Sequence, residues 1–128
     1  MDRTGRACSI RGDAGRAVRL LLAGIGDRWG LLTLATLDGE PLRFGELLTR
    51  VPGVSQRMLT RTLRQLERDG LVSRTSYPEV PPRVEYALTA TGQDLIGPAA
   101  DLADWAAAHG PGIEASRAAY DARSSGAA

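Results

Sequence analysis

The sequence predicts a mainly α (α+β) fold: a winged helix-turn-helix with a β-hairpin wing and a long C-terminal helix. Two observations predict this class. A short helical segment, a glycine-containing turn and a longer amphipathic helix follow one another over residues 44–70, which is the order of a helix-turn-helix. Two short β-type segments joined by a proline-rich loop come next, as in a wing. The chain of 128 residues is long enough for one domain with its own core.

The N-terminal part is expected to contain an arm and two helices. Residues 1–15 are polar and rich in glycine, which is typical of a mobile arm. From Arg16 to Ile25, apolar residues recur at helical spacing. Asp27 is a suitable N-cap for a second helix, which we expect over residues 28–36.

The next two helices form the expected helix-turn-helix. A short helix is predicted over Phe44–Arg50, and Pro52-Gly53 stops it. Ser55 is a good N-cap for a longer helix over Gln56–Asp69, and Gly70 ends that helix.

The wing is expected to consist of strands over residues 71–77 and 83–88. Val84, Tyr86 and Leu88 alternate with less apolar residues, which is the pattern of a half-buried strand. The proline-rich loop between the strands predicts a stiff hairpin tip.

A last helix is predicted from a cap at Thr89 or Thr91 to about His109. Gly97-Pro98 is expected to kink or split it. Residues 16–109 therefore form the predicted winged helix-turn-helix domain. Residues 110–128 form a C-terminal tail, in which a short helix is expected.

Composition excludes several classes of protein. One cysteine and one histidine can make neither an internal disulfide nor a cysteine zinc site, so no metal or cofactor is expected. No P-loop or nucleophile-elbow motif is present, and an enzyme is not expected. No apolar run approaches the ~20 residues of a membrane span, and no apolar signal segment is seen. A cytoplasmic protein without a membrane partner is the prediction.

The formal charge of +1 is unevenly distributed. Residues 43–83 carry eight arginines and four acidic residues, whereas residues 84–128 carry two arginines and six acidic residues. A basic middle and an acidic end therefore lie behind the near-neutral average.

The predicted helix over residues 56–69 has two contrasting faces. At ~100° per residue, Arg57, Arg61, Arg64 and Arg68 fall on one narrow strip, which we call the arginine stripe. Three leucines fall on the opposite face. Like charges four residues apart disfavour an isolated helix by roughly 0.2–0.5 kcal/mol per pair, so this pattern indicates an anionic partner. The alternative is an ordinary solvated face.

Double-stranded DNA is the partner that this context predicts, because the second helix of a helix-turn-helix enters the major groove with its N-terminal residues nearest the bases. Arginine can grip guanine and glutamine can grip adenine. Arg64 and the wing are expected to meet the DNA backbone or the minor groove. The candidate DNA-binding residues are Arg43, Ser55, Gln56, Arg57, Thr60, Arg61, Arg64, Arg74, Tyr77 and Arg83. Ser55 has a second interpretation as a helix cap alone, and the wing residues as a solvated strand surface.

Two further features have alternative interpretations. Trp29, Phe44, Tyr86 and Trp105 are expected to form a small core, and the alternative is a ligand pocket between Trp29, Tyr86 and Trp105. Cys8 lies between two arginines, whose charges favour the thiolate that a redox sensor needs; the alternative is an inert exposed thiol.

Several separated motifs resemble the HxlR family of bacterial winged-helix transcription regulators, over about Arg16–His109. The motifs are Ile25-Gly26-Asp27-Arg28-Trp29, Leu42-Arg43-Phe44-Gly45-Glu46-Leu47, Val54-Ser55-Gln56-Arg57-Met58-Leu59-Thr60, Leu63-Arg64-Gln65-Leu66-Glu67-Arg68-Asp69-Gly70-Leu71-Val72, Pro81-Pro82-Arg83-Val84-Glu85-Tyr86-Ala87-Leu88-Thr89, Gly92 and Trp105.

This resemblance implies a homodimer that binds an inverted-repeat operator and makes its dimer contacts through the N-terminal and C-terminal helices. In some family members a cysteine near the N-terminus senses electrophiles or oxidants. Cys8-Ser9-Ile10 is similar to that motif, although residues 11–15 lengthen the segment that follows it. A small-molecule or redox effector is therefore an implied partner. The competing function class is a winged-helix protein-interaction or dimerisation module without specific DNA binding.

Overall fold

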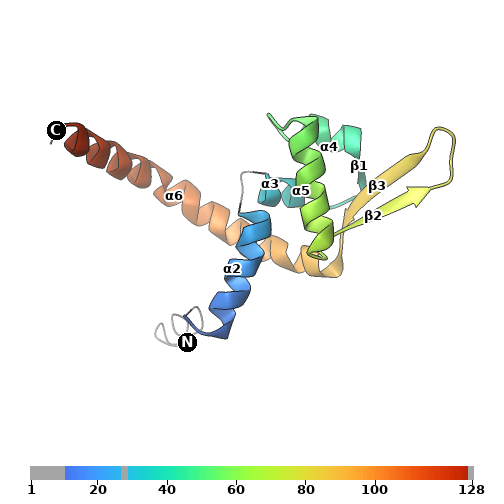
Figure 1. Ribbon diagram of the computed structural model, residues 1–128, viewed down its shortest axis with the longest axis horizontal. Helices are drawn as coiled ribbons and strands as arrows, with labels where there is room; N and C mark the ends of the chain where they lie inside the picture. Colours follow the sequence, from blue (N-terminus) through green and yellow to red (C-terminus); the bar gives the residue numbers. More distant parts are fainter. Residues whose placement is uncertain (1–10, 27–28, 127–128) are drawn as a thin grey trace. The chain divides into compact units, whose positions relative to one another are not determined.

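The computed structural model describes residues 11–26 and 29–126. Its elements are α2 (Asp13–Ile25), α3 (Gly30–Thr36), β1 (Leu42–Arg43), α4 (Phe44–Arg50), α5 (Gln56–Arg68), β2 (Val72–Tyr77), β3 (Arg83–Leu88) and α6 (Ala90–Gly126) (Figure 1). Two compact units are present, Met1–Ile96 and Gly97–Ala128. The predicted class, a winged helix-turn-helix with a long C-terminal helix, is confirmed.

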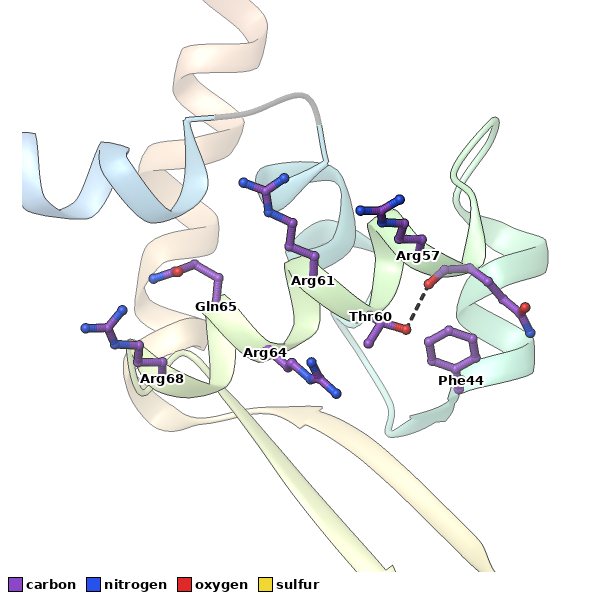
Figure 2. Close-up of a pocket in the computed structure, with 8 residues that line it drawn as sticks. Phe44, Arg57, Thr60, Arg61, Arg64, Gln65 and Arg68 are labelled. Atoms are coloured by element: carbon purple, nitrogen blue, oxygen red, sulfur yellow. Dashed lines mark hydrogen bonds between the residues drawn. The ribbon is translucent and has the colours of Figure 1, made fainter.

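Helix α5 begins and ends where the sequence predicts, to within one residue. The Ser55 hydroxyl accepts a hydrogen bond of 3.1 Å from the Met58 N–H, so it is the N-cap. At the other end, Gly70 has a φ of +75°, and the Leu71 N–H donates to the Leu66 carbonyl at 3.0 Å. This arrangement is a Schellman motif, which turns the chain directly into β2. Figure 2 shows α5 in close-up.

A three-stranded antiparallel sheet has the order β1-β3-β2. Leu42 of β1 lies opposite Tyr86, and Val72 of β2 lies opposite Leu88. The sequence did not predict β1, because two residues are too few to show a strand period. The pairing also changes β3: as the central strand it is partly covered along its whole length, so its residues do not alternate in exposure.

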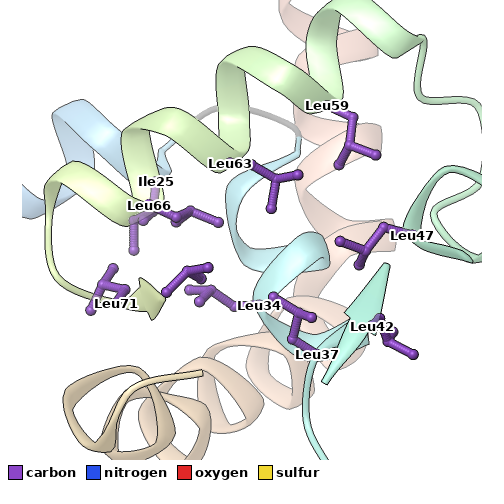
Figure 3. Close-up of a cluster of buried hydrophobic side chains, with 10 residues drawn as sticks. Ile25, Leu34, Leu37, Leu42, Leu47, Leu59, Leu63, Leu66 and Leu71 are labelled. Atoms are coloured by element: carbon purple, nitrogen blue, oxygen red, sulfur yellow. The ribbon is translucent and has the colours of Figure 1, made fainter. Parts of the chain in front are cut away.

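The core is aliphatic (Figure 3). Its buried side chains are Ile25, Leu34, Leu37, Leu42, Leu47, Leu59, Leu63, Leu66, Leu71 and Val72. The expectation that four aromatic residues form the core is wrong. Phe44 and Tyr86 only pack against its margin, and Trp105 is 52% exposed. The inward positions of α3, α4 and α5 are occupied by leucine, threonine and glycine, so the rings remain at the edges.

The starts of helices α2 and α3 differ from the prediction. Helix α2 begins at Asp13 rather than Arg16, so the last residues of the expected arm are helical. Asp27, the expected cap of the second helix, lies outside the described residues, and Trp29 is the N-cap of α3.

Helix α6 is continuous to Gly126 and has no break at Gly97-Pro98. It also contains Pro111, so the separate short helix expected in the tail is part of α6. Each proline removes one intrahelical hydrogen bond, and the many alanines around them have the highest helix propensity. The boundary between the two compact units falls at Gly97, beside the first of these prolines.

Thr89, rather than Thr91, caps α6. Its Oγ1 accepts a hydrogen bond of 3.1 Å from the Gly92 N–H and donates one of 2.6 Å to the Gly70 carbonyl. Gly92 is buried, and a Cβ at this position would collide with the Leu71 carbonyl oxygen. The start of α6 is thereby packed against the turn that ends α5.

Candidate nucleic-acid interface

The arginine stripe lies on the exposed face of α5. Arg57, Arg61, Arg64 and Arg68 are all exposed, while Leu59, Leu63 and Leu66 on the other side are buried. The four arginines line one broad hollow of about 920 Å³ (Figure 2). Phe44, Gln56, Thr60 and Gln65 complete its lining. The structure therefore brings five of the candidate DNA-binding residues, Gln56, Arg57, Thr60, Arg61 and Arg64, onto one surface.

No carboxylate neutralises the stripe within the part of the chain that the structure describes. The ion pairs there, with N···O distances up to 4.0 Å, belong to Arg50 and Arg83. Four exposed arginines on one helix face, without a carboxylate partner among those residues, create a positive potential along α5.

Polar groups at the start of α5 can read hydrogen-bonding patterns. Gln56 is exposed in the first turn. The Thr60 hydroxyl donates to the Gln56 carbonyl at 2.8 Å, so its proton is engaged and its oxygen remains an acceptor. Ser55 is engaged as the N-cap, which supports its structural interpretation.

Sequence reasoning missed Phe44 and Gln65 on this surface, and it placed Arg68 on the stripe without counting it among the candidate DNA-binding residues. Phe44 was expected in the core, but it reaches the hollow from α4 (Figure 2). Gln65 and Arg68 line the hollow toward the end of α5, and the Gln65 amide donates to the Asp69 carboxylate at 3.2 Å. The helical wheel could have found Gln65, because at ~100° per residue it flanks the stripe.

The two arginines of the wing lie on opposite faces of the sheet. Arg74 is opposite Tyr86 in the β2–β3 register, and Arg83 is opposite Tyr77. Since residues of one strand alternate between faces, these two cross-strand pairs point to different sides.

Arg83 is engaged by its neighbours. One of its Nη atoms lies 3.3 Å from Glu79 Oε1, and the other lies 3.6 Å from Glu85 Oε1. Its guanidinium also lies over the Tyr77 ring, with Cζ 4.0 Å from the ring centroid. We call Arg83, Glu79, Glu85 and Tyr77 the wing latch. Its two carboxylates offset the arginine charge, and a π contact covers one face of the guanidinium.

Arg43 and Arg50 flank α4 in different states. Arg43 is the exposed N-cap residue of α4 and lies opposite Glu85 in the sheet. Its backbone N–H donates to the Glu46 carboxylate at 3.0 Å. Arg50 pairs with Glu40 at 3.3 Å and with Glu46 at 3.9 Å.

The remaining candidate residues are placed as follows. Tyr86 lines a hollow of about 350 Å³ between α5 and the wing. Trp29 lies near Gly53, whereas Trp105 belongs to the second compact unit, where its ring stacks on His109 with centroids 4.3 Å apart. The ligand pocket between the three aromatic residues stays a prediction. Cys8, the candidate redox sensor, lies outside the described residues.

The described residues contain no cluster of three or more acidic, histidine or cysteine side chains that could hold a metal ion. None of the helices formed by these residues combines the length and apolar character needed to cross a membrane.

Comparison with known proteins agrees with this geometry. The model of the HxlR-like helix-turn-helix family matches residues 24–114. An HTH-type transcriptional regulator of Methanothermobacter thermautotrophicus is 48% identical over 94 residues, which cover 73% of this chain and 72% of that protein.

Two solved structures are similar in fold and sequence. The first is of YtfH from Salmonella typhimurium, named as a transcriptional regulator: 42% identity, a TM-score of 0.68, and coverage of 78% of this chain and 89% of that one. The second is of the redox regulator HypR in its reduced form: 35% identity, a TM-score of 0.70, and coverage of 77% and 98%.

Proposed function

The chain belongs to the HxlR-like helix-turn-helix family of transcriptional regulators, and from this premise we propose that it binds double-stranded DNA sequence-specifically, as a homodimer on an inverted-repeat operator. The observation that carries the proposal is the arginine stripe, four exposed guanidinium groups on the outer face of α5 that have no carboxylate partner in the described part of the chain. Such a face matches the phosphate-rich major groove in charge.

Within this surface, the first turns of α5 read the bases. Gln56, Arg57, Thr60 and Arg61 occupy the N-terminal half of the helix, which in this fold lies nearest the base edges. Arg57 and Arg61 can each make the bidentate contact to guanine. Arg43 and Arg64 contribute phosphate contacts, which position the helix and carry no sequence information.

A second copy of the chain supplies the other half-site. Leu102, Trp105, His109, Ile113 and Tyr120 fall on one stripe of α6 at ~100° per residue, and the four apolar members are exposed. Apolar side chains gathered in this way mark an interaction surface. In a two-fold dimer the two α5 helices would lie about one DNA turn, ~34 Å, apart.

The decisive experiment is a fluorescence-anisotropy titration with two duplexes, the region upstream of the protein's own gene and a mixed sequence, at several salt concentrations. We expect affinity to fall steeply with salt and to favour the upstream region. Arg57→Ala should reduce this preference, while Arg19→Ala, an exposed arginine on α2, is the matched control. If the protein shows no salt-dependent affinity for either duplex, the result would favour the alternative function, a protein-interaction module.

Dimerisation has its own test. Sedimentation equilibrium should give twice the chain mass for the wild type, and Trp105→Glu should shift the equilibrium to monomer. If the Trp105→Glu variant remained a dimer, this stripe of α6 would not be the dimer interface.

One relative suggests a signal. HypR is named a redox regulator and is solved in oxidised and reduced forms. We propose that an oxidant or electrophile acts on this chain at Cys8. Mass spectrometry after peroxide treatment should show modification of Cys8 together with changed DNA affinity, and Cys8→Ser is the control. Unchanged binding by the fully modified protein would exclude this role.

A further inference from the structure

A second hollow lies between the recognition helix and the wing. Its volume is about 350 Å³, and its lining is Thr60, Arg64, Glu67, Arg74 and Tyr86. Two of these residues come from the sheet and three from α5. The two guanidinium groups therefore face one space from two different elements.

The register of the sheet explains why Arg74 reaches this hollow. Val72 and Arg74 are two residues apart in β2 and share a face, and Val72 is buried in the core beneath α5. Tyr86 lies opposite Arg74 on the same face. On α5, Arg64 lies one turn after Thr60, and Figure 2 shows it turned away from Arg57 and Arg61.

The charge in this hollow is unbalanced. Neither Arg64 nor Arg74 has a carboxylate oxygen within 4.0 Å in the described parts of the chain. The Arg74 guanidinium donates a 3.4 Å hydrogen bond to the Ser76 hydroxyl. Glu67 is the one acidic residue of the lining, so two cations share one anion there. Two like charges facing one space favour an anion between them.

We propose that Arg64 and Arg74 share one phosphate, and that it is a phosphate of the DNA backbone held between α5 and the wing. The inference rests on the proposed DNA-binding function and assigns a residue pair to one contact. Planar guanidinium groups bind phosphate through paired, charge-assisted hydrogen bonds, and both Arg64 and Arg74 line the hollow. Arg74, and not Arg83 in the wing latch, is then the phosphate-binding cation of the wing.

A double-mutant cycle on a mixed-sequence duplex tests this pairing. Arg64→Ala and Arg74→Ala should each weaken binding several-fold and lower the salt slope by about 1. The double variant should be weaker by clearly less than the product of the two effects, because both arginines serve one phosphate. Arg74→Lys, which keeps the charge, should recover part of the loss.

The matched control is the pair Arg57 and Arg74. These residues line different hollows, so their effects on affinity should multiply. Multiplicative effects for Arg64 and Arg74 as well would overturn the shared phosphate, and so would an Arg74→Ala variant with wild-type affinity.

Inorganic phosphate distinguishes the source of the anion. The Arg64 and Arg74 Nε–H resonances, followed by NMR, should shift with phosphate, and adding the duplex should release the phosphate and move them to the positions of the DNA complex. Phosphate and duplex bound at the same time would overturn the DNA assignment.

A failure of the proposed DNA-binding function would give a different result from a failure of the shared phosphate. Wild-type protein without salt-dependent affinity for any duplex would reject DNA binding itself. Salt-dependent binding by the wild type together with a multiplicative Arg64/Arg74 cycle would reject only the shared phosphate.

Discussion

Helix α5 and the wing both carry arginines, but the structure places the four arginines of α5 and Arg83 of the wing in opposite states. On α5, Arg57, Arg61, Arg64 and Arg68 are exposed, and no carboxylate of residues 11–26 or 29–126 pairs with them. In the wing, Arg83 is held by two carboxylates and a tyrosine ring.

The difference shows that the number of arginines is a poor guide to the charge a surface presents. The wing strands and their loop carry two arginines and two glutamates, and so have no formal net charge. Helix α5 therefore contributes most of the positive potential, and in the wing Arg74 rather than Arg83 is the arginine without a carboxylate partner among the described residues.

The largest effect is expected on α5. Arg61→Ala should reduce the free energy of binding to the upstream duplex by about 1–3 kcal/mol and relax sequence preference, because a bidentate base contact is lost. Anisotropy titrations on the upstream and mixed-sequence duplexes measure both effects. An equal loss on both duplexes would show that Arg61 contacts phosphate instead.

Disrupting the wing latch should lower the stability of the protein rather than change the salt dependence of DNA binding. Arg83→Ala removes two part-exposed ion pairs and a cation–π contact, so we expect roughly 1–2 kcal/mol lower free energy of unfolding in urea. The salt slope of DNA binding should stay near that of the wild type. A slope lowered by about 1 would instead return Arg83 to the set of phosphate contacts.

Two substitutions at Ser55 distinguish its role as a helix cap from a role as a phosphate contact. Ser55→Ala should lower the free energy of unfolding by about 1 kcal/mol, because the Met58 N–H loses its acceptor. Ser55→Asp restores a cap and adds negative charge. If it recovers stability but binds DNA more weakly, the side chain lies near phosphate; recovery of stability with wild-type affinity leaves Ser55 as a cap alone.

The smallest expected effect concerns Glu67, the carboxylate in the hollow between α5 and the wing. Glu67→Gln removes a negative charge beside the proposed phosphate site, so DNA affinity should rise by about 0.2–0.5 kcal/mol. Competition between variant and wild type for one labelled duplex resolves a change of this size. Weaker binding would mean that Glu67 positions Arg64 or Arg74.

Local patterns were enough to predict most elements of the fold. Helix α4 and strand β3 have the predicted bounds, because their ends are determined by prolines, glycines and periodicity within a few residues. The face of α5 that carries the arginine stripe also followed from its spacing alone. Strand β1 did not, since its only signal is a pairing with β3, more than forty residues along the chain.

The wing latch shows why the candidate site was only partly predictable. Arg83 and Arg74 look alike in the sequence, and nothing local tells which one faces α5. That depends on the β2–β3 register, which places Arg74 opposite Tyr86 and Arg83 opposite Tyr77. The prediction of an aromatic core was wrong for a related reason. The size of an aromatic side chain suggests burial, but leucines occupy the inward positions of the helices.

The Thr89 hydroxyl links the end of α5 to the start of α6 through two hydrogen bonds. It uses its proton on the Gly70 carbonyl at the end of α5 and its oxygen on the Gly92 N–H in the first turn of α6. Because Gly92 also packs directly against the Leu71 carbonyl, no flexible linker separates these turns. Any rotation of the first turn of α6 is therefore transmitted to the end of the helix that bears the arginine stripe, or else breaks a 2.6 Å hydrogen bond.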